Sequence, residues 1–191
     1  TNNLTQEDFN RLNVTGNGFG ILATHYQSGN GNIEDPNVLL SATNSIQLQT
    51  ADDEAIKAQR KNVVKLLSGT GGIVVATQAD SSTSETPVGG STAINASLGS
   101  IVNLESTGDI GILGNIDINN KAVSDGQNNS FHKDTKIIFK GKNSGVFAQN
   151  GNALSVAQSG SFESEATESN NIISYGGNAV VVEDSDSNLS L

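Results

Sequence analysis

The sequence predicts an all-β protein built as a parallel β-helix, a solenoid in which successive coils of chain stack on one another. Its core is thin: of 191 residues 35% are hydrophobic and 4% aromatic, whereas 24 Asn, 23 Ser and 21 Gly make up more than a third of the chain. Short segments such as 45–49 and 100–104 alternate apolar with polar residues and lie between turn-forming residues. Apolar clusters that follow Gly or Asn recur along the chain. These observations favour a core spread along a rod.

The recurrence has a nearly constant step. The last three clusters begin at Gly111, Gly145 and Asn178, so the steps between them are 34 and 33 residues. The earlier steps, from Gly20 to Gly72 and on to Gly111, are longer, and an insertion of about 18 residues explains the first of them. We expect each step to span 1.5 to 2 coils, with about eight coils in a rod about 40 Å long. A β-sandwich with irregular strands explains the alternation equally well, but not the step.

Residues 51–68 predict the one long helix of the chain. Thr50 and Asp53 have the spacing of a capping box, although Asp replaces the preferred Glu or Gln. Ile56, Val63 and Leu67 form one apolar stripe at helical spacing. This helix is the insertion that lengthens the step.

A shorter helix is expected near the N-terminus, over about residues 6–12, with Thr5 as its cap. The chain then divides into three parts of one continuous solenoid. Residues 1–50 carry the N-terminal helix and the first coils, residues 51–89 a helix-plus-loop insertion, and residues 90–191 the β-helix repeats.

Composition excludes several classes of function. The formal charge is −10, from 20 acidic and 10 basic residues, so we expect no nucleic-acid partner, because such binding depends on Lys and Arg. The chain has no Cys, which excludes disulfides, thiolate metal sites and cysteine nucleophiles. Its longest apolar runs, such as 180–182, are only a few residues, so we expect no transmembrane segment.

Catalytic and cofactor motifs are weak. His25 and His132 could each serve a Ser and Asp pair, but no G-x-S-x-G elbow and no two-His zinc spacing occurs, and we interpret both as surface or turn residues. Residues 18–23 match G-x-G-x-x-A, yet no helix pattern follows, so repeat punctuation is the better interpretation. We assign no catalytic residue and no cofactor.

Asp184, Asp186 and Asn188 have the alternating spacing of the first ligands of a calcium loop. The turn Gly and the closing Glu of such a loop are absent. We therefore interpret the segment as a solvated corner and assign no metal site.

A local basic patch stands out in this acidic chain. It comprises His132, Lys133, Lys136, Lys140 and Lys142. The patch could bind an acidic glycan or an anionic surface. The alternative is a solvated loop that flanks the apolar segment 137–139.

Lys57, Lys61 and Lys65 recur at i, i+4 spacing, which predicts the exposed face of the inserted helix. The only Arg residues, Arg11 and Arg60, lie outside the expected repeats. This disfavours a β-helical polysaccharide lyase or glycosidase, although paired carboxylates could still converge in the fold.

Two segments resemble the passenger repeats of type V autotransporters: GKNSGVFAQNGNALSVAQSGSFES (141–164) and NIISYGGNAVVVEDSDSNLSL (171–191). Such repeats typically contain Gly, Ile or Val, an aromatic residue and Ala, followed by an Asn-Gly turn, as in 145–151. The style is most similar to the very large autotransporter adhesins of fusobacteria. The resemblance covers 90–191 well and 16–50 weakly, and 51–89 depart from it.

The resemblance implies a right-handed β-helix that is secreted and displayed on the bacterial cell surface, anchored in the outer membrane by a barrel outside this chain. The chain would be a segment of a longer, non-enzymatic adhesin that binds a protein or glycan receptor on a host or neighbouring bacterial cell. We expect the partner site in the insertion, 51–89, with its loop Asp80–Gly90. The alternatives are an autotransporter toxin passenger that oligomerises on membranes and a β-helical polysaccharide-degrading enzyme.

Overall fold

The computed structural model of the chain describes residues 11–25, 32–51, 53–77, 92–119 and 135–191. These residues form sixteen strands and no helix, and all strand pairings among them are parallel. The all-β prediction is confirmed, and the parallel pairing favours a solenoid over the alternative of a β-sandwich with irregular strands. No helix among the described residues could cross a membrane. The strands are β1 (Arg11–Gly16), β2 (Ile21–Ala23), β3 (Val38–Ser41), β4 (Ser45–Thr50), β5 (Ile56–Ala58), β6 (Val63–Ser68), β7 (Gly72–Thr77), β8 (Thr92–Ser97), β9 (Ile101–Ser106), β10 (Ile110–Leu113), β11 (Asn115–Asn119), β12 (Lys136–Ala148), β13 (Leu154–Val156), β14 (Ser161–Ser174), β15 (Val180–Val182) and β16 (Asn188–Ser190).

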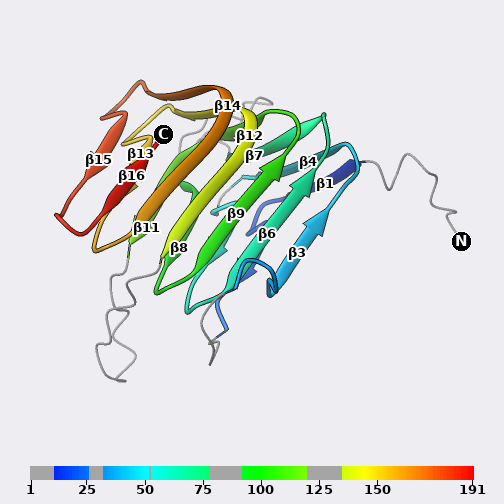
Figure 1. Cartoon of the computed structure of the whole chain (residues 1–191), viewed down its shortest axis with the longest axis horizontal. Coiled ribbons are helices and arrows are strands. Elements are labelled where there is room, and N and C mark those ends of the chain that lie inside the picture. The colour runs from blue at the N-terminus through cyan, green and yellow to red at the C-terminus, as the bar shows by residue number, and fades with distance from the viewer. Residues whose placement is uncertain (1–10, 26–31, 52, 78–91, 120–134) are drawn as a thin grey trace, which may run out of the picture.

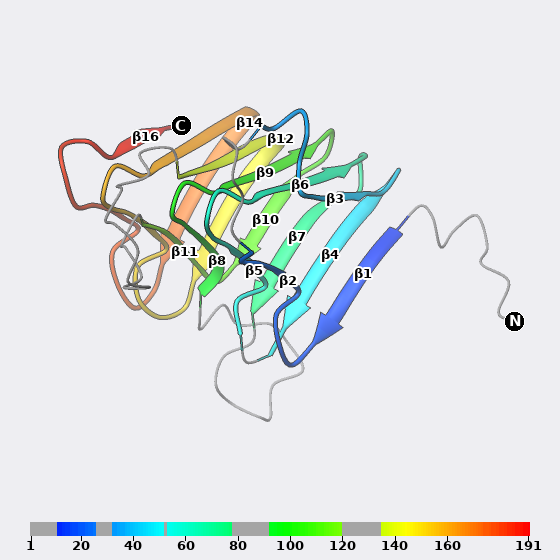
Figure 2. The same ribbon diagram turned by 90° about the horizontal axis from the view of Figure 1, so that it is seen from below.

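The strands form two sheets (Figure 1). Each strand up to β9 pairs with the third strand after it, and each strand from β10 to β14 pairs with the second, because the long strands β12 and β14 each replace two shorter ones. The six-stranded sheet has the order β15-β13-β11-β8-β5-β2. The ten-stranded sheet has two wings that share the long strands β12 and β14 (Figure 2). The first wing contains β1, β4, β7, β10 and residues 144–148 and 169–174, and the second wing contains β3, β6, β9, β16 and residues 136–140 and 161–165. The chain visits first wing, six-stranded sheet and second wing in turn, and we call one such passage a circuit.

The register gives the length of each circuit. On the first wing Arg11 pairs with Ser45 and Ser45 with Gly72, which are steps of 34 and 27 residues. Gly111 pairs with Gly145, so the predicted step of 34 residues is correct there. Gly145 then pairs with Asn171, a step of 26, and the predicted step to residue 178 is wrong. Each step is one circuit through the first wing, the six-stranded sheet and the second wing, and the described residues make six circuits where eight coils were expected.

The helix predicted over 51–68 is wrong. Ile56–Ala58 forms β5 and Val63–Ser68 forms β6, and both strands pair with neighbours on either side. Between them Arg60 and Lys61 have φ of 57° and 63°, in the left-handed region, which no right-handed helix contains. The expected insertion therefore contributes β5, β6 and β7 to the two sheets, and residues 78–89 lie outside the described residues.

The helix predicted over about 6–12 is not present where the structure describes that segment. Arg11 and Leu12 belong to β1, where they pair with Ser45 and Ile46. Residues 6–10 lie outside the described residues.

One corner of the circuit is built the same way three times. The pairs Arg60–Lys61, Leu98–Gly99 and Gln158–Ser159 each place two consecutive residues at positive φ before the chain enters the second wing. At the middle corner the buried Ser100 hydroxyl shares its one hydrogen between the carbonyl oxygens of Ala58 and Ser97, at 2.7 and 2.8 Å. Backbone groups at a buried corner need such partners, so the corners fix where each strand starts.

The core lies between the wings and the six-stranded sheet, and it is made of ladders of similar side chains. Alternate residues of each strand point inward, so one position repeats from circuit to circuit. Phe139 and Phe162 make an edge-to-face contact, with ring centroids 5.1 Å apart and an interplanar angle of 82°. One ladder is Ile21, Ile56, Ile94, Ile116, Leu154 and Val180, along which burial decreases at both ends. A second ladder is Leu40, Leu66, Leu104 and Phe139, along which only Leu40 is partly buried.

Candidate functional site

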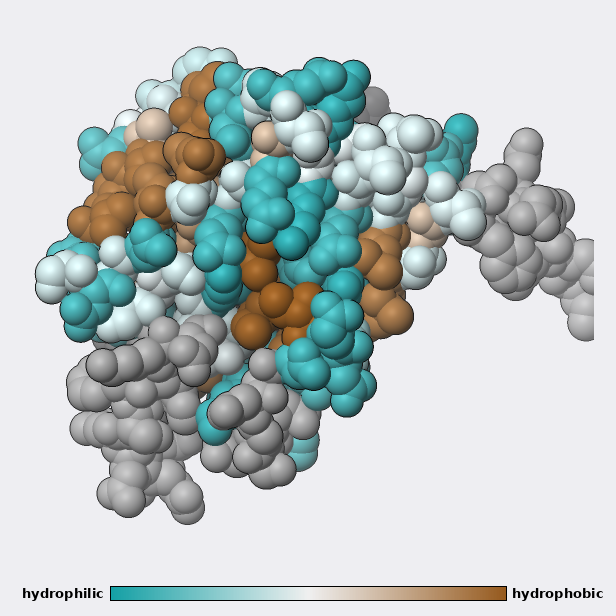
Figure 3. Space-filling model, in the orientation of Figure 1, coloured by the Kyte–Doolittle hydropathy of each residue, from teal (hydrophilic) through white to brown (hydrophobic). Residues whose placement is uncertain are grey.

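The predicted basic patch lies partly on the second wing, where its lysines are paired. Lys136, Lys140 and Lys142 contact Glu163, Glu165 and Glu168 at 2.6, 3.3 and 3.5 Å. Each glutamate comes from the next circuit, and hydrophilic side chains gather over this wing in Figure 3. The structure therefore shows a ladder of ion pairs, and His132 and Lys133 lie outside the described residues.

The three lysines at i, i+4 spacing do not share a helix face. Lys57 lies on β5, where its Nζ is 3.2 Å from Glu54 and 5.2 Å from the Phe19 ring centroid. Lys65 lies on β6 and contacts Glu105 at 3.4 Å. Lys61 occupies the left-handed corner between those strands. The prediction of a single basic stripe is wrong because the chain turns between the first and third lysine.

The two arginines lie within the circuits, which corrects the expectation that they fall outside the repeats. Arg11 begins β1 and Arg60 forms part of the corner after β5.

Asp184 holds a corner together. Its carboxylate accepts hydrogen bonds from the backbone N–H groups of Gln158, Ser159 and Asp186 and from the hydroxyl of Ser187. Desolvation would raise its pKa, but these hydrogen bonds outweigh it and hold the pKa below 3.8. Among the described residues no group of three or more His, Asp or Glu could hold a metal. The structure thus gives this segment a structural role at a corner.

The histidine and glycine motifs bring no catalytic group together. His25 is exposed, and its carbonyl accepts from Asn62 Nδ2 at 2.6 Å. The second half of residues 18–23 is strand β2, so the match to a nucleotide fingerprint lacks its helix. Gly20 lies where an added Cβ would be 2.7 Å from the carbonyl oxygen of Ala55. His132 and the loop Asp80–Gly90 lie outside the described residues.

The outer surface of the six-stranded sheet carries one perturbed carboxyl. Asp117 on β11 has Asn95 and Ser155 as its outward neighbours in register. Burial raises the pKa of Asp117, the Asn119 amide at 3.0 Å opposes this, and the charges of Glu183 and Glu54 raise the pKa further. This carboxyl is the strongest acid–base candidate in the described part of the chain.

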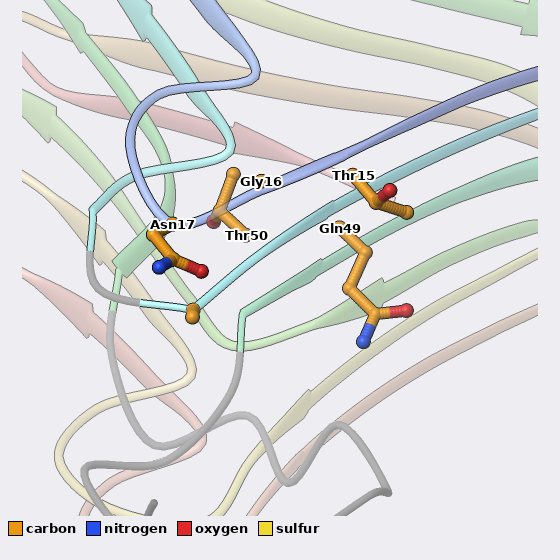
Figure 4. A pocket seen from close by; sticks show the side chains of 6 residues that line it. Thr15, Gly16, Asn17, Gln49 and Thr50 are labelled. Carbon is orange, nitrogen blue, oxygen red and sulfur yellow. The ribbon is translucent and has the colours of Figure 1, made fainter.

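A small open hollow of about 280 Å³ lies at the end of β1 and β4 (Figure 4). Thr15 and Gln49, which pair in register, line it together with Gly16, Asn17 and Thr50. None of its lining residues is ionisable. The hollow can therefore offer hydrogen bonds but no acid–base chemistry.

The outer surface of the first wing is chemically different from these regions. Its strands contain one ionisable residue, Arg11, whereas the strands of the second wing contain six. The last three circuits arrange their outward residues in three rows. The polar row is Asp109, Asn143, Ser169, the glycine row is Gly111, Gly145, Asn171, and the apolar row is Leu113, Phe147, Ile173.

Hydrogen bonds between side chains of neighbouring circuits hold the polar row in place. Asn143 Nδ2 donates to Asp109 at 2.8 Å, and the Ser169 hydroxyl donates to Asn143 Oδ1 at 2.6 Å. Phe147 is 36% exposed, and a Cβ at Gly145 would lie 2.9 Å from its Cε2, so the ring leans over that glycine. At Gly111 an added Cβ would meet nothing within 4 Å, which leaves open surface beside the ring.

This surface is not predicted by any single segment of the sequence. The segments 109–113, 143–147 and 169–173 come from three different circuits and are brought together only by the register. A usable signal is present in the sequence, because a polar residue, Gly and an apolar residue occupy alternate positions in the first two segments, and the third differs only in having Asn171 in place of Gly.

No protein-family model, curated protein or solved structure matches the chain.

Proposed function

We propose that the chain is a segment of a right-handed parallel β-helix from the passenger of a type V autotransporter adhesin, secreted and displayed on the bacterial cell surface. It acts without catalysis and binds a protein or glycan receptor on a host or neighbouring bacterial cell. The architecture is supported by six circuits of parallel strands that stack in register. The right hand is supported by the strong preference of crossovers between parallel strands for that hand.

The outer surface of the first wing carries the adhesin proposal. In a chain of charge −10 this surface has almost no charge, and it exposes apolar side chains, with Phe147 at 36%, Ile173 at 37% and Tyr175 at 78%. Protein surfaces that bind partners are depleted in charge at their centre and enriched in aromatic residues. The surface is broad and open, which suits attachment better than turnover of a small substrate.

Bead attachment tests this proposal. Fluorescent beads coated with residues 1–191 are added to epithelial cells and to bacterial cells, with beads coated with heat-unfolded chain as the control. We expect saturable attachment that soluble folded chain competes away. Attachment that is absent, or equal for folded and unfolded chain, would contradict an adhesin. Leakage of liposomes at the same concentrations would favour the toxin alternative instead.

One observation favours a second candidate, a β-helical polysaccharide-degrading enzyme. The raised pKa of Asp117 is a property that a general acid requires. The test is release of reducing ends from a polysaccharide panel by the wild-type chain and by Asp117→Asn. Release that disappears in the variant would support the enzyme, and no release from any polysaccharide would exclude it.

A further inference from the structure

We infer that the outer surface of the last three circuits of the first wing binds an uncharged oligosaccharide. The site consists of the polar row, the glycine row and the apolar row, with Tyr175 beside them. This inference rests on the proposed function, because it names the receptor class of the proposed adhesin.

The scarcity of charged residues in the three rows favours an uncharged ligand. Asp109 is the one ionisable residue in the three rows, and it accepts a hydrogen bond from Asn143. An anionic glycan needs Lys or Arg beside it. The nearby cations Lys136, Lys140 and Lys142 lie on strand segments of the second wing or at the bend of β12, and each contacts a glutamate. A polyanion would also be repelled by the net charge of −10.

The shape of the surface suits a sugar ring. Outward residues along a strand are about 7 Å apart and neighbouring strands about 4.8 Å apart, so the open strip at Gly111 has sugar-like dimensions. The ring of Phe147 leans toward this strip from the apolar row, over Gly145. One face of a pyranose ring is rich in C–H bonds, which stack on the electron-rich face of an aromatic ring.

Hydrogen-bonding groups border the strip on its other side. Asn143 uses one side-chain donor on Asp109 and accepts from Ser169, so one amide hydrogen is left for a ligand. Asn171 is exposed in the glycine row. Amide donors and acceptors match the hydroxyl groups of a sugar, and they need no charge on the ligand. The strip therefore has an aromatic ring for stacking on one side and amide groups for hydrogen bonds on the other. This combination suits a neutral carbohydrate.

The test begins with an array of neutral oligosaccharides, including cellohexaose, chitohexaose, maltohexaose and galactose-terminated chains, with a heparin hexasaccharide as the anionic comparator. The neutral glycan that binds is then titrated calorimetrically against the wild-type chain and two variants. Phe147→Ala removes the stacking ring and should weaken binding about tenfold. Gly111→Val fills the open strip, where an added Cβ meets nothing within 4 Å, and should weaken binding without unfolding the chain.

Gly16→Val is the matched control. An added Cβ at Gly16 also meets nothing within 4 Å, and Gly16 lines the hollow at β1 and β4. We expect its affinity to equal that of the wild type, with unchanged circular dichroism for all variants. Weakening by Gly16→Val alone, binding of heparin alone, or no neutral glycan bound would overturn the inference. If beads still attach to cells stripped of glycans, the adhesin proposal survives and the glycan inference fails.

Discussion

The two wings share β12 and β14, yet their outer surfaces are chemically opposite. On the second wing Lys140 pairs in register with Glu105 on one side and Glu165 on the other. On the first wing the corresponding positions carry glycine, amide and apolar side chains, including Phe147. The same backbone arrangement therefore presents two different surfaces. On the second wing the charged side chains form ion pairs with one another, and on the first wing uncharged amide and apolar side chains are exposed to solvent.

The difference shows which surface is available to a partner. Opposite charges on neighbouring strands favour a single register, because a shifted strand would bring like charges together. A partner that bound the second wing would have to displace those ion pairs. A partner on the first wing displaces only water from apolar and amide groups.

The largest expected effect lies beneath the second wing. Phe139 is fully buried and packs edge to face against Phe162. Phe139→Ala should lower the free energy of unfolding by about 3–5 kcal/mol, because the cavity cannot be refilled by the stacked neighbours. Urea unfolding followed by circular dichroism measures this change. A loss below about 1 kcal/mol would mean that the ring is not part of the core.

The same substitution on the first wing should behave differently. Phe147 is 36% exposed and rests on Gly145, so Phe147→Ala should change the free energy of unfolding by less than about 1 kcal/mol. The urea midpoint of this variant should lie close to that of the wild type. A loss as large as that of Phe139→Ala would show that the ring serves the fold and not a partner.

The ion pairs of the second wing should each contribute even less to the free energy of unfolding. Lys136 and Glu163 are 2.6 Å apart with side chains 29% and 31% exposed. A double-mutant cycle with Lys136→Gln and Glu163→Gln should give a coupling of about 0.2–1 kcal/mol, reduced in 1 M salt. Coupling that is independent of salt would contradict a solvent-screened ladder.

The smallest effect is a pH dependence at the corner of Asp184. Its folded-state pKa is lowered, so the unfolded chain binds its proton more readily. The stabilisation is complete above the unfolded pKa of about 3.9 and is lost as the pH falls through the lower folded value. The Tm of the wild type should exceed that of Asp184→Asn at pH 7, and the two should converge in strong acid. A gap that widens on acidification would contradict the assignment.

Period-two alternation was enough to predict an all-β fold, and the step from Gly111 to Gly145 is a true register pair. The false helix arose because Ile56, Val63 and Leu67 happen to have helical spacing. The deciding pattern is period-two alternation, which buries Ile56 and Ala58 of β5 and Val64 and Leu66 of β6 on either side of a left-handed corner. At such a corner the backbone hydrogen bonds to neighbouring circuits override the helix propensity of the residues.

The predicted step from residue 145 to residue 178 is wrong for a different reason. On the first wing the circuits vary between 26 and 37 residues, as the register pairs Ser144 with Asn170 and Ile73 with Ile110 show. Short apolar clusters on different sheets look alike, so a cluster on the six-stranded sheet was aligned with one on the first wing. The sequence does not reveal that the lysines of the patch are paired, because their glutamate partners lie one circuit further along the chain.

The central claim is that the outer surface of the first wing binds the receptor and that of the second wing does not. Masking one wing at a time tests it most directly. The chain has no Cys, so a cysteine placed by Asn171→Cys on the first wing or Glu165→Cys on the second can be labelled uniquely with a polyethylene glycol maleimide. Attachment of coated beads to cells is then compared before and after labelling. We predict that the label at residue 171 abolishes attachment and the label at residue 165 leaves it intact. Loss of attachment with the label at 165, and not at 171, would contradict the account.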